Sequence, residues 1–183
     1  MRRAAGILCL LLAPLAAQTP ARLTTGALAA PVAAAKIPQG MLDNLEKNFD
    51  SRLMAFDSMD PVDMLGGTRG LYIQGFGTVF TTEISLIVTP GNFPIARPTF
   101  TPEIRAQVHQ RKMARLPKLQ EIMKDMVKVT AKTLLTLPDD QRIILAVRLR
   151  YLPEEDTAGL PSQISMSADK KSALLGDIKT EIE

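Results

Sequence analysis

The sequence predicts an α+β domain, in which an antiparallel or mixed sheet of about four or five strands carries a long kinked helix and an N-terminal helix on one face. Two observations predict the helices, because apolar residues recur every three or four positions in residues 40–58 and again in residues 102–136. A third observation predicts the strands, since apolar and polar residues alternate in residues 71–88 and 141–152. A length of 183 residues, 46% of them hydrophobic, suits one such domain.

The first helix is predicted over residues 40–58. Its apolar positions are Met41, Leu42, Leu45, Phe49, Leu53 and Phe56, with charged residues between them. The helix is expected to end before Asp60-Pro61, because a proline disfavours helical backbone in the residue before it. The glycine-rich residues 64–70 that follow are expected to form a loop.

Residues 71–88 predict two strands that meet at Gly75-Phe76-Gly77. The second strand has one apolar face, which includes Phe80 and Ile84. Two glycines around one residue permit positive φ on both sides of a turn, so a tight hairpin is favoured over a bulge in one long strand.

A long helix is predicted after the proline-rich connection of residues 89–102. Thr101 suits the N-cap, Pro102 the first helical position and Glu103 the first turn. Pro117 is expected to kink the helix or to divide it in two, and Pro138 to stop it. The expected buried stripe is Ile104, Val108, Leu116, Leu119, Ile122, Met123, Met126, Val127, Thr130, Leu134 and Leu137.

The C-terminal third predicts further strands. Residues 141–152 are typical of a central strand, with Arg148 and Arg150 on one face and an apolar series on the other. Residues 163–168 predict another strand and residues 170–175 a short helical turn, and alternation resumes over residues 178–183.

The N-terminus has the pattern of a secretory signal peptide in residues 1–17. Arg2 and Arg3 precede an apolar run, and small residues end it, so cleavage is expected after Ala17. A short uncleaved membrane anchor is the alternative, although the apolar run is shorter than the roughly 17 residues that a span needs. Residues 18–38 are rich in alanine, proline and threonine and predict a flexible linker, so the folded domain is expected over residues 39–183.

One stretch carries a resemblance to known proteins. The segment Tyr72-Ile73-Gln74-Gly75-Phe76-Gly77-Thr78-Val79-Phe80, followed by a long helix and by the strand that Leu137-Pro138 precedes, resembles uncharacterised secreted bacterial proteins. The resemblance covers residues 40–183. It implies an exported protein and brings no activity with it.

Catalytic chemistry has few candidate residues. A catalytic triad or a histidine metal site would have to use His109, the only histidine, and the only cysteine, Cys9, lies in the predicted leader. Phosphate-binding and metal-binding motifs are absent from the sequence, so neither a metal nor another cofactor is expected. A catalytic pair of carboxylates stays possible, because four acids lie in predicted loops: Asp60, Asp63, Asp139 and Asp140. Acids near helix ends, however, usually serve as caps.

Charge patterning gives the candidate binding residues. Basic residues outnumber acidic ones in residues 101–136, and Lys124, Lys128 and Lys132 fall on one helical face. Such a row is commonly a solvated face, and it can also bind an anionic partner. Arg148 and Arg150 are added because two arginines on one strand face must meet acids, water or a ligand. Tyr72 is added as a side chain that an enzyme pocket could bring together with them.

Three functions follow from these patterns. The favoured one is a non-catalytic exported module that docks on an envelope protein or a membrane surface through the basic helix, residues 102–136. The alternatives are a small-molecule or lipid carrier with an apolar cleft between sheet and helix, and a hydrolase-type enzyme that uses loop carboxylates. A nucleic-acid partner is not expected, because the formal net charge is only +3 and includes Arg2 and Arg3. The oligomeric state stays open.

Overall fold

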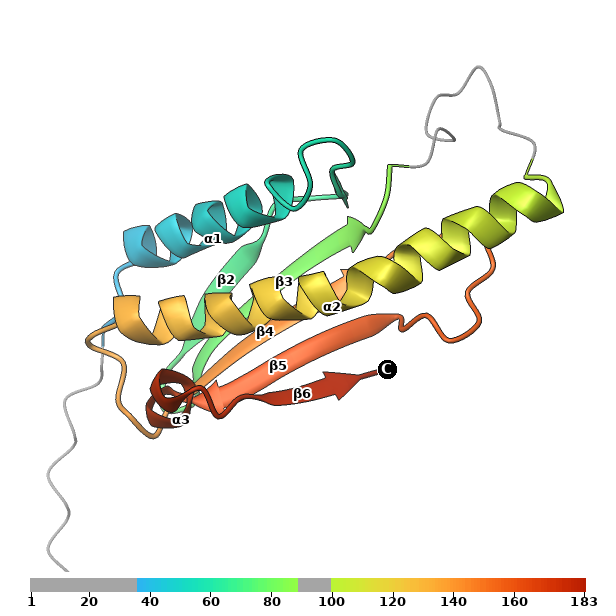
Figure 1. The fold of residues 1–183 in the computed structure, drawn as a ribbon. Helices are drawn as coiled ribbons and strands as arrows, with labels where there is room; N and C mark the ends of the chain where they lie inside the picture. Colours follow the sequence, from blue (N-terminus) through green and yellow to red (C-terminus); the bar gives the residue numbers. More distant parts are fainter. Residues whose placement is uncertain (1–35, 89–99) are drawn as a thin grey trace, which may run out of the picture. The chain divides into compact units, whose positions relative to one another are not determined.

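The computed structural model describes residues 36–88 and 100–183, and these residues form three helices and a six-stranded sheet (Figure 1). The predicted leader, residues 1–17, lies outside the described residues, as do most of the predicted linker and residues 89–99 of the proline-rich connection. In chain order the elements are α1 (Gln39–Met54), β1 (Asp63–Met64), β2 (Arg69–Ile73), β3 (Gly77–Ser85), α2 (Pro102–Thr133), β4 (Arg142–Leu149), β5 (Gln163–Asp169), α3 (Lys170–Leu175) and β6 (Lys179–Ile182).

The sheet is mixed, as predicted. Its order is β1, β3, β4, β5, β6, and β2 pairs with β3 on the same side as β1. Only β3 and β4 pair in parallel, which α2 permits because it carries the chain from one end of the sheet back to the other. All other pairs are antiparallel.

One predicted loop is partly wrong. Residues 64–70 were expected to lie outside the sheet, but Met64 pairs with Ile84 and Arg69 pairs with Thr81. The loop therefore shrinks to residues 65–68, which interrupt one edge strand. Of the glycines that suggested a loop, Gly70 is required by the sheet, because a Cβ there would lie 2.5 Å from the Phe80 ring, whereas a Cβ on Gly66 would meet nothing within 4 Å.

The hairpin between β2 and β3 is confirmed. Gly75 has φ 76° and Gly77 has φ 135°, values that side chains rarely adopt. A Cβ on Gly77 would lie 1.9 Å from the carbonyl oxygen of Arg142 on β4. Gly77 thus serves both the turn and the close approach of β4.

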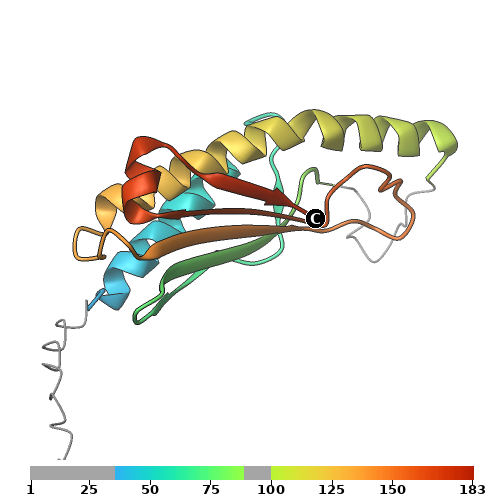
Figure 2. The same cartoon turned by 90° about the horizontal axis from the view of Figure 1, so that it is seen from below.

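The core lies between one face of the sheet and the helices, as predicted. Alternate residues of β3, β4 and β5 are buried toward α1 and α2. Among the described residues no helix covers the opposite face of the sheet (Figures 1 and 2). Burial of each large aliphatic side chain in this core contributes about 1.5–3 kcal/mol to the free energy of folding. The most completely buried ones are Leu53, Ile84, Leu119, Met123, Val127, Leu134, Ile143, Val147 and Ile164.

α1 also covers the edge of the sheet that β2 forms. The Asp50 carboxylate accepts hydrogen bonds from the Thr68 backbone N–H, at 2.9 Å, and from the Thr68 hydroxyl. The Glu46 carboxylate, one turn earlier, accepts the backbone N–H of Gly70 at 2.7 Å. Outward N–H groups of this edge are therefore satisfied by a helix of the same chain.

α2 begins as predicted and differs in its interior. The Thr101 hydroxyl accepts the Ile104 N–H at 3.4 Å, and Pro102 and Glu103 occupy the first turn. Pro117 does not divide the helix, which continues to Thr133, because core contacts hold it beyond that point. Ile104 is 42% exposed and does not belong to the buried stripe.

No helix in residues 36–88 and 100–183 combines the length and the hydrophobicity that a membrane crossing requires.

Candidate binding surface

The six predicted site residues lie in three separate places. Lys124, Lys128 and Lys132 lie on α2, Arg148 and Arg150 lie at the end of β4, and Tyr72 lies on β2. Tyr72 pairs with the buried Thr78 and packs against the core on the helix-facing side of the sheet. It therefore cannot share a site with Arg148, whose side chain lies on the opposite face.

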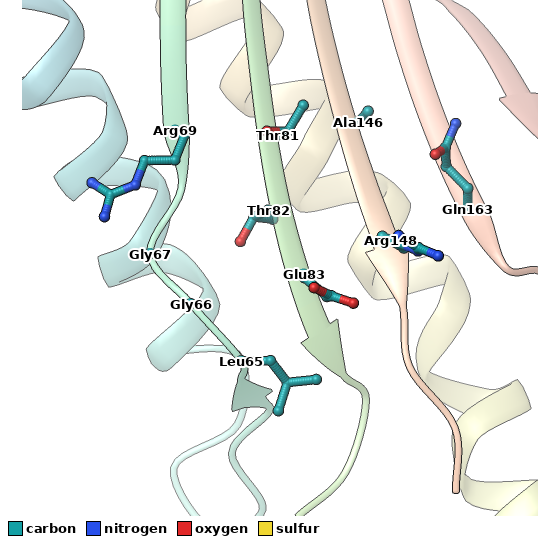
Figure 3. A pocket seen from close by; sticks show the side chains of 10 residues that line it. All are labelled: Leu65, Gly66, Gly67, Arg69, Thr81, Thr82, Glu83, Ala146, Arg148 and Gln163. Carbon is teal, nitrogen blue, oxygen red and sulfur yellow. The ribbon is translucent and has the colours of Figure 1, made fainter. Parts of the chain in front are cut away.

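Arg148 and Arg150 lie beside a glutamate of the neighbouring strand. Glu83 is the register neighbour of Arg148 on β3, and its carboxylate pairs with the Arg150 Nε at 3.0 Å. Beside them the open face of the sheet has a hollow of about 370 Å³ (Figure 3). It is lined by Leu65, Gly66, Gly67, Arg69, Thr81, Thr82, Glu83, Ala146, Arg148 and Gln163.

This hollow does not concentrate positive charge on a ligand. Figure 3 shows the Arg69 guanidinium directed away from Arg148, and Glu83 lies between the two strands that carry them. The Glu83 carboxylate thus pairs with one of the two arginines that the sequence singled out, Arg150. Arg148 is its register neighbour on β4.

Two of the four candidate catalytic acids, Asp60 and Asp139, form ion pairs within the fold. Asp60 forms ion pairs with Arg111 and with Arg115, whose Nη1 lies 2.7 Å from the carboxylate, and these pairs tie the segment after α1 to α2. Asp139 lies 3.8 Å from the Lys170 Nζ. Over the described ranges no group of three or more histidines, cysteines and acids is arranged to hold a metal ion.

His109, Met123 and Met126 likewise make structural contacts. The His109 Nδ1 lies 3.1 Å from the carbonyl oxygen of Asp156, so the ring is partly covered by the loop after β4. Met123 and Met126 are 0% and 3% exposed and belong to the core.

A buried ion pair joins α2 to the same loop. Lys112 lies on the buried stripe of α2, although the predicted stripe contained no lysine. Its Nζ donates to Glu155. The Nζ also lies 4.9 Å from the centre of the Tyr151 ring. Burial, together with the charge of Glu155, raises the pKa of Tyr151 to about 12.

The three predicted lysines remain available at the C-terminal half of α2. Lys124 and Lys132 are exposed, and in the part of the chain that the structure describes neither forms an ion pair. Lys128 lies 3.9 Å from Asp125, and its Cε approaches Gly176, the residue that ends α3. The lysine row therefore runs beside α3. The basic residues nearer the start of α2 differ, because Arg111, Lys112 and Arg115 are bound to acids.

Exposed leucines lie on α3 and directly after α2. Leu135, just after α2, is 78% exposed, and Leu174 and Leu175 of α3 are 47% and 80% exposed. α3 is fixed there because the Lys170 Nζ donates to the carbonyl oxygens of Leu135, at 3.0 Å, and Leu137, at 2.7 Å. We call this surface the α2–α3 corner. It consists of Lys124, Lys128, Lys132, Leu135, Leu174 and Leu175.

The lysines of the corner were predicted and the leucines were not. Leu134-Leu135 and Leu174-Leu175 are adjacent pairs, and neighbouring helical residues point about 100° apart, so both members of such a pair rarely face the core together. In the first pair Leu134 is buried and Leu135 is exposed, and in the second both leucines are exposed. The adjacency is present in the sequence, although it does not say which surface the leucines join. The contact between α2 and α3 decides that point.

Comparison with protein-family models, with characterised proteins and with solved structures finds no match. The resemblance to uncharacterised secreted bacterial proteins stays a prediction.

Proposed function

We propose that this chain is a non-catalytic exported module that docks on an anionic membrane surface through the α2–α3 corner. The observation that carries the proposal is the presence of three exposed leucines beside a row of lysines. Apolar side chains that enter the boundary of the bilayer, flanked by cations that meet phosphate headgroups, are the features of interfacial binding. We commit to a membrane because an anionic bilayer presents headgroup charge and an apolar boundary within one surface.

The proposed contact is reversible. A lysine near an anionic surface contributes about 1 kcal/mol, and burial of a leucine side chain about 1.5–3 kcal/mol. Asp125 offsets part of the charge through its contact with Lys128. A few such contributions produce a weak, salt-sensitive association rather than an insertion.

The path of the chain is compatible with docking at this surface. α1 and α2 run in opposite directions, so the start of α1 lies beside the end of α2 (Figures 1 and 2). Residues 36–38, where the predicted linker ends, therefore enter the domain near the α2–α3 corner. A leader retained as an anchor would hold this corner toward the membrane, and a cleaved leader would leave docking to the corner alone.

The two alternative functions have less support. A carrier needs an apolar cleft between sheet and helix, and buried side chains such as Leu119, Met123 and Ile143 occupy that space. A hydrolase needs convergent carboxylates, and Asp60 and Asp139 instead bind cations in different parts of the domain.

Vesicle flotation tests the proposal. The full chain is mixed with vesicles of phosphatidylcholine alone or with about one third phosphatidylglycerol, at low and high salt. We expect flotation only with the anionic vesicles and a loss of flotation as salt rises. Lys124→Glu with Lys132→Glu, and separately Leu174→Ser with Leu175→Ser, should each weaken flotation about tenfold or more.

Lys47→Glu provides the matched control, because Lys47 is an exposed lysine of α1 far along the chain from the corner. This variant should float like the parent chain. Equal flotation of every variant, or no flotation at any salt, would contradict membrane docking. Loss of flotation in the lysine variant with no effect of the leucine changes would contradict insertion of the leucines and leave a purely electrostatic contact with the headgroups.

A further inference from the structure

The two edges of the sheet are treated differently by the fold. On the β2 edge, outward N–H groups of Thr68 and Gly70 donate to carboxylates of α1. On the other edge, β6 pairs with β5 alone, and all four of its residues are exposed. A regular edge strand without such cover is a template for another strand.

The hydrogen bonds of β5 and β6 show which groups face outward. Gln163 and Glu183 exchange reciprocal backbone bonds of 3.0 and 3.2 Å, so their pair is a hydrogen-bonded one. Because such pairs alternate along an antiparallel ladder, Glu181 and Lys179 also bond inward, to Ser165 and Ser167. The N–H and C=O groups of Thr180 and Ile182 therefore point away from the sheet.

The charges of β6 select one way for this strand to pair with itself. When two β6 strands pair antiparallel, residues whose backbone N–H and C=O groups point outward must lie opposite each other. Three symmetric registers meet this condition, and they are centred on residues 179, 180 and 181. Centring on Lys179 or on Glu181 places like charges opposite each other. Centring on Thr180 places Lys179 of each copy opposite Glu181 of the other copy.

We propose that two copies of this chain join through β6, antiparallel and centred on Thr180, into one continuous sheet. Thr180 of each copy then bonds reciprocally to Thr180 of the other. On the helix side, Ile178, which packs against the core, lies opposite the second copy's Ile182, which is 57% exposed in the single chain. The same register thus matches charge on one face and apolar side chains on the other.

The contact between Lys179 and Glu181 within one strand suits this arrangement. In the single chain the Lys179 Nζ donates to Glu181, and this bond lowers the pKa of the Glu181 carboxyl. Both side chains already lie on the open face of the sheet as charged groups. Pairing joins two such contacts into a network of alternating charges.

Charge reversal tests the register through the native mass of the full chain. We expect a dimer in the parent protein over a concentration series, and at least about tenfold weaker dimerisation in Lys179→Glu and in Glu181→Lys. An equimolar mixture of these two variants should form a heterodimer, because each lysine again meets a glutamate. The contact within one strand stays broken in both chains, so it cannot explain recovery in the mixture.

Crosslinking tests the centre of the interface. With Cys9→Ser in the background, Thr180→Cys should form a disulfide-linked dimer readily, since paired residues of this type lie about 5.5 Å apart. Gln74→Cys, at the exposed end of the hairpin, is the control that should not. A monomeric parent chain, a mixture that stays monomeric, or equal crosslinking at both positions would overturn the proposal.

Discussion

Lys112 is the residue whose position is hardest to read from the sequence. It lies in a basic stretch of α2 and is fully buried, while its partner Glu155 lies in the loop after β4. The four carbons of a lysine can follow an apolar stripe, so periodicity alone does not exclude it. What decides its burial is a partner 43 positions along the chain.

Replacing Lys112 should destabilise the domain strongly. Lys112→Ala removes both the cation beside a buried carboxylate and the packing of the side chain, so we expect a loss of about 3–5 kcal/mol in the free energy of unfolding. Urea unfolding measures it. Lys112→Met with Glu155→Leu should be less destabilised than Lys112→Ala, because both charges leave together. A loss below about 1 kcal/mol in Lys112→Ala would mean that the pair is solvated.

Tyr151 should make the stability fall at alkaline pH. Its pKa is raised from 10.0 to about 12, so the unfolded chain ionises first as pH rises above 10. Stability from the neutral phenol is complete below pH 10 and is lost as pH approaches 12. Urea unfolding between these values should show a steeper decline in the parent chain than in Tyr151→Phe. Identical slopes would contradict the shift.

At the scale of elements, local patterns account for the helices and the main strands. Alternation located β3, β4 and β5 within a few residues, and the capping residues located the start of α2. β1 was not predicted, because two residues are too few to show an alternation of apolar and polar side chains. Only their pairing with Ile84 and Ser85 makes them a strand. The parallel pairing of β3 with β4 is also a long-range property.

The two hairpin glycines should differ in what a side chain costs. Gly77→Ala would combine φ 135° with a clash against Arg142 of β4, so we expect about 3 kcal/mol or more of destabilisation. Gly75→Ala meets nothing within 4 Å and should cost about 1 kcal/mol. Thermal or urea unfolding compares them. Equal losses would show that β4 yields to the new side chain.

At the scale of the whole molecule, the sequence predicted half of the candidate surface. The lysines follow from helical spacing, whereas the leucines join them only because α3 docks beside α2 through Lys170. Tyr72 and Arg148 were grouped as candidates although the sheet separates them, because alternation within a strand does not say which face another strand presents.

The proposed pairing and the proposed docking surface reinforce each other. The axis that relates two antiparallel edge strands is perpendicular to the sheet, so both copies keep their helices on the same side. Two α2–α3 corners then face one membrane, and binding of the second becomes intramolecular. In vesicle flotation, Lys179→Glu and Glu181→Lys should each bind about tenfold more weakly than their mixture. Equal vesicle binding by the single variants and by their mixture would show that docking does not depend on pairing through β6.

The helix that runs along β2 also limits how far such an assembly can grow. A sheet with two open edges could add copies without end and form fibres. Here the carboxylates of Glu46 and Asp50 occupy one edge, and residues 65–68 break its regularity. Within residues 36–88 and 100–183, β6 is then the one open edge. The proposed pairing through β6 would therefore stop at two copies, because α1 covers the other edge of each sheet.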